Sequence, residues 1–192
     1  MRLTILCLVA SAVLPLASQA QAPVFAITPA ESKVKFDVKA SVAITGTFDK
    51  WDATLVFTSP DINTGVLDIK IQADSVETGS DMKNGKLKGK DFFDAKQNPL
   101  ITFLSKKIVQ TGQDTFEVDG DFTIRGVTKP EKLLLVVSGA RTGAAAIKGT
   151  MAFDRKDYGM NSGIPFIKIA DRVEVTVDLN AKRVSGPPVN LK

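Results

Sequence analysis

Apolar and polar residues alternate along five segments of the chain. In residues 33–39, Val34, Phe36 and Val38 alternate with three lysines and an aspartate. The same pattern recurs in residues 67–73, 116–124, 147–153 and 173–179. Because successive side chains of a strand point to opposite faces, each segment is predicted to be a strand with one buried and one solvated face.

Additional strand candidates and turn sequences complete the predicted fold. The candidates are residues 24–28, 46–58, 100–109 and 132–139, and turn sequences such as SPDINTG and QTGQD separate them. Eight or nine antiparallel strands with one polar face predict an all-β protein, with a closed barrel favoured over a sandwich. Small residues at Ala73, Gly120 and Gly149 on the inward rows suit a tapered or ligand-holding interior.

Two segments interrupt the strand pattern. In residues 76–99, Thr78 is followed three residues later by Asp81, which is a weak capping signal for a short helix. We therefore expect a helical insert around residues 78–95. The second segment, residues 154–171, is a long connection of the kind that often carries function in compact domains.

The N-terminal residues have the order of a secretory signal. Arg2 precedes an apolar run from Leu3 to Leu16, and small residues surround Ala20. We expect residues 1–20 to be a signal peptide, with cleavage after Ala20 or after Ala22. Residues 21–185 would then form one domain, with residues 186–192 as a C-terminal tail.

The residue types that the chain lacks limit its chemistry. The sequence has no histidine, and its one cysteine lies in the predicted signal. Imidazole and thiol catalysis and the usual zinc sites are therefore excluded from the mature protein, and no carboxylates show an acid–base pattern. We expect a protein that is not an enzyme and has no cofactor or metal. A net charge of +4, spread along a chain of mixed charges, does not indicate nucleic-acid binding.

An exported protein without cysteines in its mature part is typical of a bacterial periplasm, where a domain of this length needs no disulfides. We therefore expect a periplasmic location in a Gram-negative bacterium.

Six motifs, in order, resemble the YceI-like family of periplasmic lipid-binding proteins. They are FAITPAESKVKFDV, GTFDKWDATLVF, DSVETG, LKGKDFFDAKQNPLITFLS, VDGDFTIRGVTKPEKL and FDRKDYGM. The resemblance implies a lipocalin-like, eight-stranded antiparallel β-barrel with an apolar tunnel, which binds polyisoprenoids or related long-chain lipids without catalysis. The Arg-Asp-x-His-Leu run of many members is replaced here by Lys83-Asn84-Gly85-Lys86-Leu87.

Apolar side chains expected inside the barrel or at its mouth are the candidate ligand-binding residues. They are Phe36, Val38, Phe48, Trp51, Leu67, Ile69, Ile71, Phe92, Phe93, Phe103, Phe122, Phe153, Tyr158, Met160 and Phe166. Plain core packing remains an alternative for each aromatic residue. For the adjacent pair we expect Phe93 to lie in the core and Phe92 to cap the barrel mouth, since the two sit at the end of the insert.

Four basic residues are candidates for contact with a lipid head group. They are Lys83, Lys86, Arg125 and Arg155. The alternatives are a solvated lysine face and an ion pair of Arg155 with Asp154 or Asp157. A rival function is a packed barrel that docks on a membrane or protein through its lysine-rich insert. Transient contact with a membrane surface and a homodimer also remain open.

Overall fold

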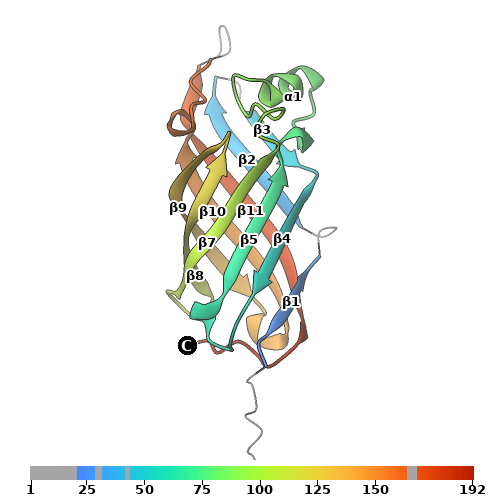
Figure 1. The fold of residues 1–192 in the computed structure, drawn as a ribbon, viewed down its shortest axis with the longest axis vertical. Coiled ribbons are helices and arrows are strands. Elements are labelled where there is room, and N and C mark those ends of the chain that lie inside the picture. The colour runs from blue at the N-terminus through green and yellow to red at the C-terminus, as the bar shows by residue number, and fades with distance from the viewer. Residues whose placement is uncertain (1–20, 29–31, 42–43, 164–167) are drawn as a thin grey trace, which may run out of the picture.

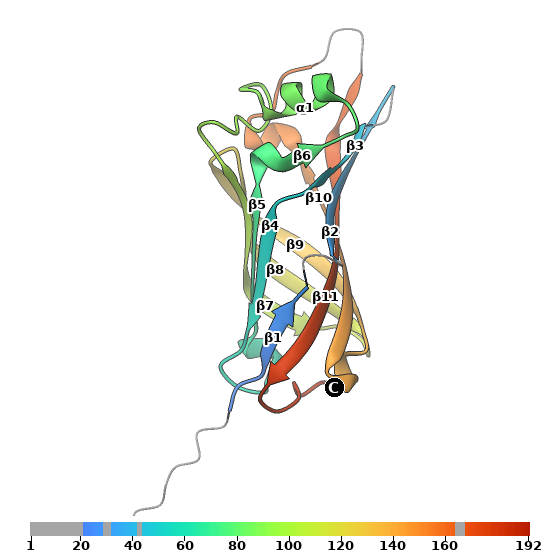
Figure 2. The ribbon, with the colours of Figure 1, turned by 90° about the vertical axis from the view of Figure 1, so that its right-hand side faces the viewer.

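The strands form one sheet that closes into an elongated barrel (Figures 1 and 2). The computed structural model describes residues 21–28, 32–41, 44–163 and 168–192. Its strands are β1 (Val24–Ile27), β2 (Lys33–Ala40), β3 (Ile44–Phe48), β4 (Trp51–Val56), β5 (Val66–Gln72), β6 (Val76–Glu77), β7 (Leu100–Gln110), β8 (Thr115–Ile124), β9 (Val127–Ser138), β10 (Ala144–Asp154) and β11 (Ile169–Ser185).

The barrel wall contains eight antiparallel positions. One position is shared by β1 and β2, because both pair with β11, at different parts of its length. Another is shared by β3 and β4, because only Asp49 and Lys50 separate these two strands. The wall closes because β1 pairs with β11 on one side and with β4 on the other, where Val24 faces Val56. The predicted eight-stranded antiparallel barrel is therefore confirmed, and the candidate strand at 46–58 consists of β3 and β4.

The alternation in the sequence corresponds to the inner and outer faces of the wall. In β2, Val34, Phe36 and Val38 are buried, whereas the residues between them are exposed. The pattern breaks once in β7, where a register shift leaves both Lys106 and Lys107 exposed. A bulge of this kind adds one residue to the strand, so two successive side chains point outward and the next one, Ile108, points into the core again.

The helical insert lies at the upper end of the barrel, between β5 and β7 (Figure 1). It consists of η3 (Ala73–Ser75), β6, α1 (Asp81–Lys88) and a turn-rich segment that leads into β7. The N-cap of α1 is Ser80 instead of Thr78. Thr78 contributes differently: its backbone N–H and its hydroxyl both donate to the side-chain oxygen of buried Asn84.

Short helical turns and the C-terminal residues occupy the lower end. The turns are η2 (Ile62–Thr64) and η4 (Ala140–Thr142). Residues 186–192, expected as a tail, lie across this end: the Asn190 N–H donates to the Pro60 carbonyl at 2.8 Å. The Lys192 N–H donates to the Gln110 side chain at 2.7 Å. None of the helices in the described part of the chain has the length and apolar character needed to cross a membrane.

Candidate functional site

Two apolar chambers formed by the described residues lie inside the barrel, one toward each end. Counted as the space that the centre of a water molecule can occupy, their volumes are about 80 Å³ in the lower chamber and 70 Å³ in the upper one. The two share no lining residue. The interior is therefore divided, and differs from the continuous tunnel that the family resemblance implied.

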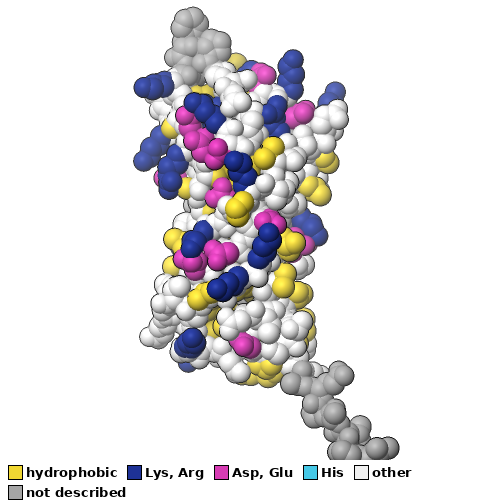
Figure 3. Space-filling view, turned by 60° about the vertical axis from the view of Figure 1, so that its left-hand side comes forward, with side chains coloured by type: hydrophobic (Ala, Val, Ile, Leu, Met, Phe, Trp, Pro, Cys, Tyr) yellow, Lys and Arg dark blue, Asp and Glu magenta, His cyan; other side chains and the backbone are white. Residues whose placement is uncertain are grey.

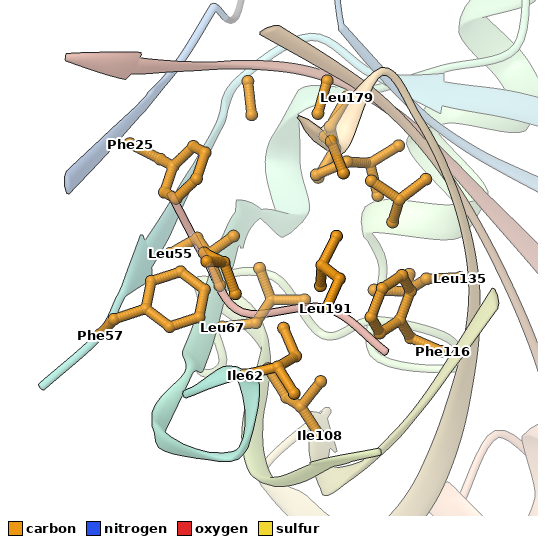
Figure 4. Close-up of a pocket in the computed structure, with 16 residues that line it drawn as sticks. Phe25, Leu55, Phe57, Ile62, Leu67, Ile108, Phe116, Leu135, Leu179 and Leu191 are labelled. Atoms are coloured by element: carbon orange, nitrogen blue, oxygen red, sulfur yellow. The ribbon is translucent and has the colours of Figure 1, made fainter. Parts of the chain in front are cut away.

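The lower chamber is lined by side chains from β1, β4, β5, β7, β8, β9, β10 and β11. Figure 4 shows Phe25, Leu55 and Phe57 on one side of it and Phe116 and Leu135 on the other. Val189 and Leu191 of the C-terminal segment complete the lining. Apart from Leu67, none of the candidate binding residues that the structure describes lines this chamber, although the alternating pattern had placed Phe116, Ile147 and Leu179 on the inward face.

The upper chamber contains most of the candidate binding residues. Those that line it are Phe36, Val38, Phe48, Ile71, Phe92, Phe93, Phe122, Phe153 and Met160, together with the head-group candidate Arg155. Every other lining residue is apolar, including Leu87 of α1. The insert thus contributes both to the wall and to the cover of this chamber.

The remaining candidates lie elsewhere. Ile69 and Phe103 are buried but line neither chamber. Trp51 is half-buried and borders a surface groove beside Asp49 and Lys70. Phe166 lies outside the described residues. Ligand contact by the whole candidate set stays a prediction.

The adjacent phenylalanines at the end of the insert occupy different surroundings. The Phe93 ring lies against Phe36 and Phe48, with centroid distances of 6.4 and 5.8 Å, and belongs to the core cluster. Phe92 lies outside that cluster, and the Lys86 ammonium is 5.9 Å from the centre of its ring. Phe93 is therefore a core residue, whereas Phe92 lines the upper chamber from the insert that covers it.

The lysines of the insert have acidic neighbours. Lys86 donates a hydrogen bond to Asp91 at 2.6 Å, and this bond lowers the pKa of the Asp91 carboxyl. Lys88 lies near Glu77, whose pKa is lowered chiefly by a hydrogen bond from Asn84. On the face drawn in Figure 3, basic and acidic side chains are interspersed. Part of the positive charge of the insert is therefore balanced locally.

Arg155 connects the long loop to β11 from a buried position. Its guanidinium donates to the carbonyl oxygens of Met160, Ser162 (3.0 Å) and Ala170 (3.2 Å), and it pairs with Asp171 at 3.0 Å. The suggested pairing with Asp154 or Asp157 is therefore wrong. The sequence could not show that the path of the loop brings Asp171, at the far end of the connection, to Arg155.

Arg125 connects the insert to the turn after η5 (Arg155–Tyr158). It lies at the β8–β9 turn with φ of 55°, and its guanidinium donates to the carbonyls of Gly159 and of Lys90, the latter at 2.9 Å. Four guanidinium nitrogens that could have met a head group, two of Arg125 and two of Arg155, thus donate to backbone carbonyls of the insert, the long loop and β11. Head-group contact by either arginine stays a prediction.

Tyr158 is fully buried beside the upper chamber. Its ring lies 5.5 Å from Phe122 and 5.2 Å from Phe153, and its hydroxyl donates to Glu131 at 2.8 Å. Burial raises the pKa of the Tyr158 hydroxyl, and the hydrogen bond to Glu131 raises it further. The tyrosine therefore stays protonated, and its position indicates that it supports the chamber wall.

The C-terminal segment offers a direct test of how the lower chamber is closed. Replacing both Val189 and Leu191 with serine should lower the free energy of unfolding by about 1–2 kcal/mol, because both side chains are only half-buried. Binding of a fluorescent apolar dye should rise as the chamber opens. Val184→Ser, an exposed valine of β11, is the control. Equal dye binding by both variants would contradict this role.

Comparison with known proteins supports the same architecture. The family model described as YceI-like domain matches residues 25–181. A UPF0312 protein of Pseudomonas savastanoi pv. phaseolicola is 28% identical over 133 residues, which are 67% of this chain and 69% of the relative. The crystal structure of Burkholderia cenocepacia BcnA has a TM-score of 0.73 at 27% identity and covers 81% of this chain and 99% of its own.

A third structure shares the fold at lower identity. A polyisoprenoid binding domain from Saccharophagus degradans has a TM-score of 0.66 at 15% identity, covering 84% of this chain and 99% of its own. At that identity the likeness concerns the fold alone.

Proposed function

Because the chain belongs to the YceI-like family, we propose that it is a non-catalytic carrier that holds an apolar chain of isoprenoid or acyl type inside its barrel. The observation that carries this proposal is the pair of chambers lined almost entirely by apolar side chains. The Saccharophagus degradans neighbour, described as a polyisoprenoid binding domain, shares the fold, and we extend its ligand class to this chain as part of the proposal.

The energetics of such a site favour a chain-like ligand. Burial of apolar surface stabilises a complex by about 25 cal/mol per Å², so many weak contacts can replace a few strong ones. Phe92, Phe93, Phe122 and Phe153 supply broad apolar faces to the upper chamber. The proposed polar end of the ligand lies toward the cover, where Lys86, Asp91 and Arg155 are found.

The proposed location is the periplasm. It is supported by the signal-like order of residues 1–20, which lie outside the described part of the chain. Export would place the carrier between two membranes, where a water-filled compartment separates sources and acceptors of apolar chains.

Native mass spectrometry of protein isolated from a Gram-negative periplasm tests the proposal. We expect an added mass from an apolar amphiphile that organic extraction removes. Val173→Trp should reduce the bound fraction, because Val173 lines the upper chamber and a larger side chain would fill it. Glu174→Trp, at the exposed neighbouring position of β11, is the matched control and should bind as the wild type does.

Two outcomes would contradict the carrier proposal. Absence of any amphiphile, or equal loss in Val173→Trp and Glu174→Trp, would argue against a ligand in the upper chamber. Salt-sensitive binding to anionic liposomes, lost when Lys83, Lys86, Lys88 and Lys90 are all changed to alanine, would instead favour docking through the insert.

A further inference from the structure

A belt of buried side chains separates the two chambers. Its members face inward from six consecutive strands, line neither chamber and are each at most 8% exposed. They are Ile69, Phe103, Val118, Leu133, Met151 and Val177. The belt lies across the interior, so it closes the inner end of each chamber.

Two glycines allow the belt to close tightly. A Cβ added to Gly120 would lie 2.7 Å from Cζ of Phe103, and one added to Gly149 would lie 2.4 Å from a methyl group of Val177. Both distances are far below ordinary carbon contact, so the larger side chains rest directly on the glycine backbone. The Phe103 ring therefore occupies a notch in β8 that no other residue type would leave open.

Phe103 lies next to residues that line the upper chamber, on the side toward the lower one. Ile101, two residues earlier on the same face of β7, lines that chamber, and so does Phe122, the register partner of Phe103 in β8. On the other side, Phe103 pairs with Ile69 of the belt. An apolar chain that enters from the covered end and extends down the barrel meets the ring of Phe103 before it reaches the lower chamber.

We propose that Phe103 sets the length of apolar chain that the upper chamber accepts, by closing the inner end of this chamber. This inference rests on the proposed carrier function and deepens it. Each methylene that enters the chamber should raise the affinity about fourfold. Once the ligand chain reaches Phe103, further methylenes remain outside the chamber, near the insert, and no longer raise the affinity.

Binding of a homologous series to the delipidated protein measures this limit. The probes are saturated fatty acids from octanoate to eicosanoate, with affinity followed by displacement of a fluorescent fatty acid. For the wild type we expect affinity to rise with length and then to level off. Phe103→Ala should move the levelling point to longer chains, because the ring no longer separates the chambers.

Two further variants keep the test decisive. Phe103→Leu retains an apolar side chain and should shift the levelling point in the same direction but less, which decides the question if Phe103→Ala does not fold. Leu104→Ala, on the outer face of β7 with 46% exposure, is the control and should leave the point unchanged. An identical levelling point in all variants would overturn the role of Phe103 while leaving the carrier function intact. Failure of the wild type to bind any fatty acid or periplasmic amphiphile would overturn both.

Discussion

Replacing Arg155 with methionine is expected to lower the free energy of unfolding by about 3–5 kcal/mol. The arginine is 6% exposed and donates to three backbone carbonyls in addition to Asp171. Methionine could fill much of the volume but would leave those acceptors without their donor. Urea unfolding followed by circular dichroism measures the difference.

Arg172 provides the matched control for this change. Its side chain is 70% exposed and its contact with Glu174 is 3.5 Å long, so Arg172→Met should cost less than about 1 kcal/mol. Arg155→Lys should also be less stable than the wild type, because one ammonium group cannot reproduce the planar set of guanidinium donors. Similar losses for the Arg155 and Arg172 variants would contradict the assigned role.

The effect of Arg155→Met on stability should depend on pH. Hydrogen bonding from Lys156 lowers the pKa of Asp171, and the charge of Arg155 adds to this effect. A carboxyl with a lowered pKa in the folded state stabilises the protein above its unfolded pKa of about 3.9, and the contribution disappears as pH falls through the folded value. The stability difference between the wild type and Arg155→Met should therefore narrow in acid.

Replacing Phe93 with alanine should lower the free energy of unfolding by about 3–5 kcal/mol. Its ring fills the core between β2, β3 and the end of the insert, against Phe36 and Phe48. The resulting cavity cannot be closed without moving the cover of the upper chamber. Urea unfolding provides the measurement, with the exposed Met82→Ala in α1 as control.

Phe92→Ala separates packing from ligand contact. Phe92 is 5% exposed, so some stability is lost, about 1.5–3 kcal/mol by area burial alone. Since Phe92 lies outside the core cluster, we expect the loss to be smaller than for Phe93, whereas retention of a bound amphiphile should fall clearly. Equal, large stability losses with unchanged retention would make both residues packing residues only.

The architecture could be predicted from the sequence because strand periodicity acts locally. In residues 33–39 and 116–124, alternate apolar residues specify an inner face whatever the neighbouring strand is. Turn residues and the length of the chain then favour a closed barrel. The family resemblance implied the helical insert and the ligand class that we propose, from motifs in their order along the chain.

The sequence could not show how inward side chains from different strands meet. Gly120 and Phe103 are separated along the chain, and only the β7–β8 register brings the ring onto the glycine. Likewise, Val189 and Leu191 looked like part of a tail because two apolar residues in a short polar segment carry no periodic signal. The partner of Arg155 also depended on the path of the long loop.

The sequence by itself determined the strands, their inward faces, the position of the insert and the family, since each depends on residues close together in the chain. Only the tertiary structure decided that the interior is divided into two chambers, that both arginines bind backbone carbonyls around the upper one, and that the Phe103 ring rests on Gly120 between the two. These features depend on the register between strands and on the three-dimensional fit of side chains distant in sequence, neither of which periodicity encodes.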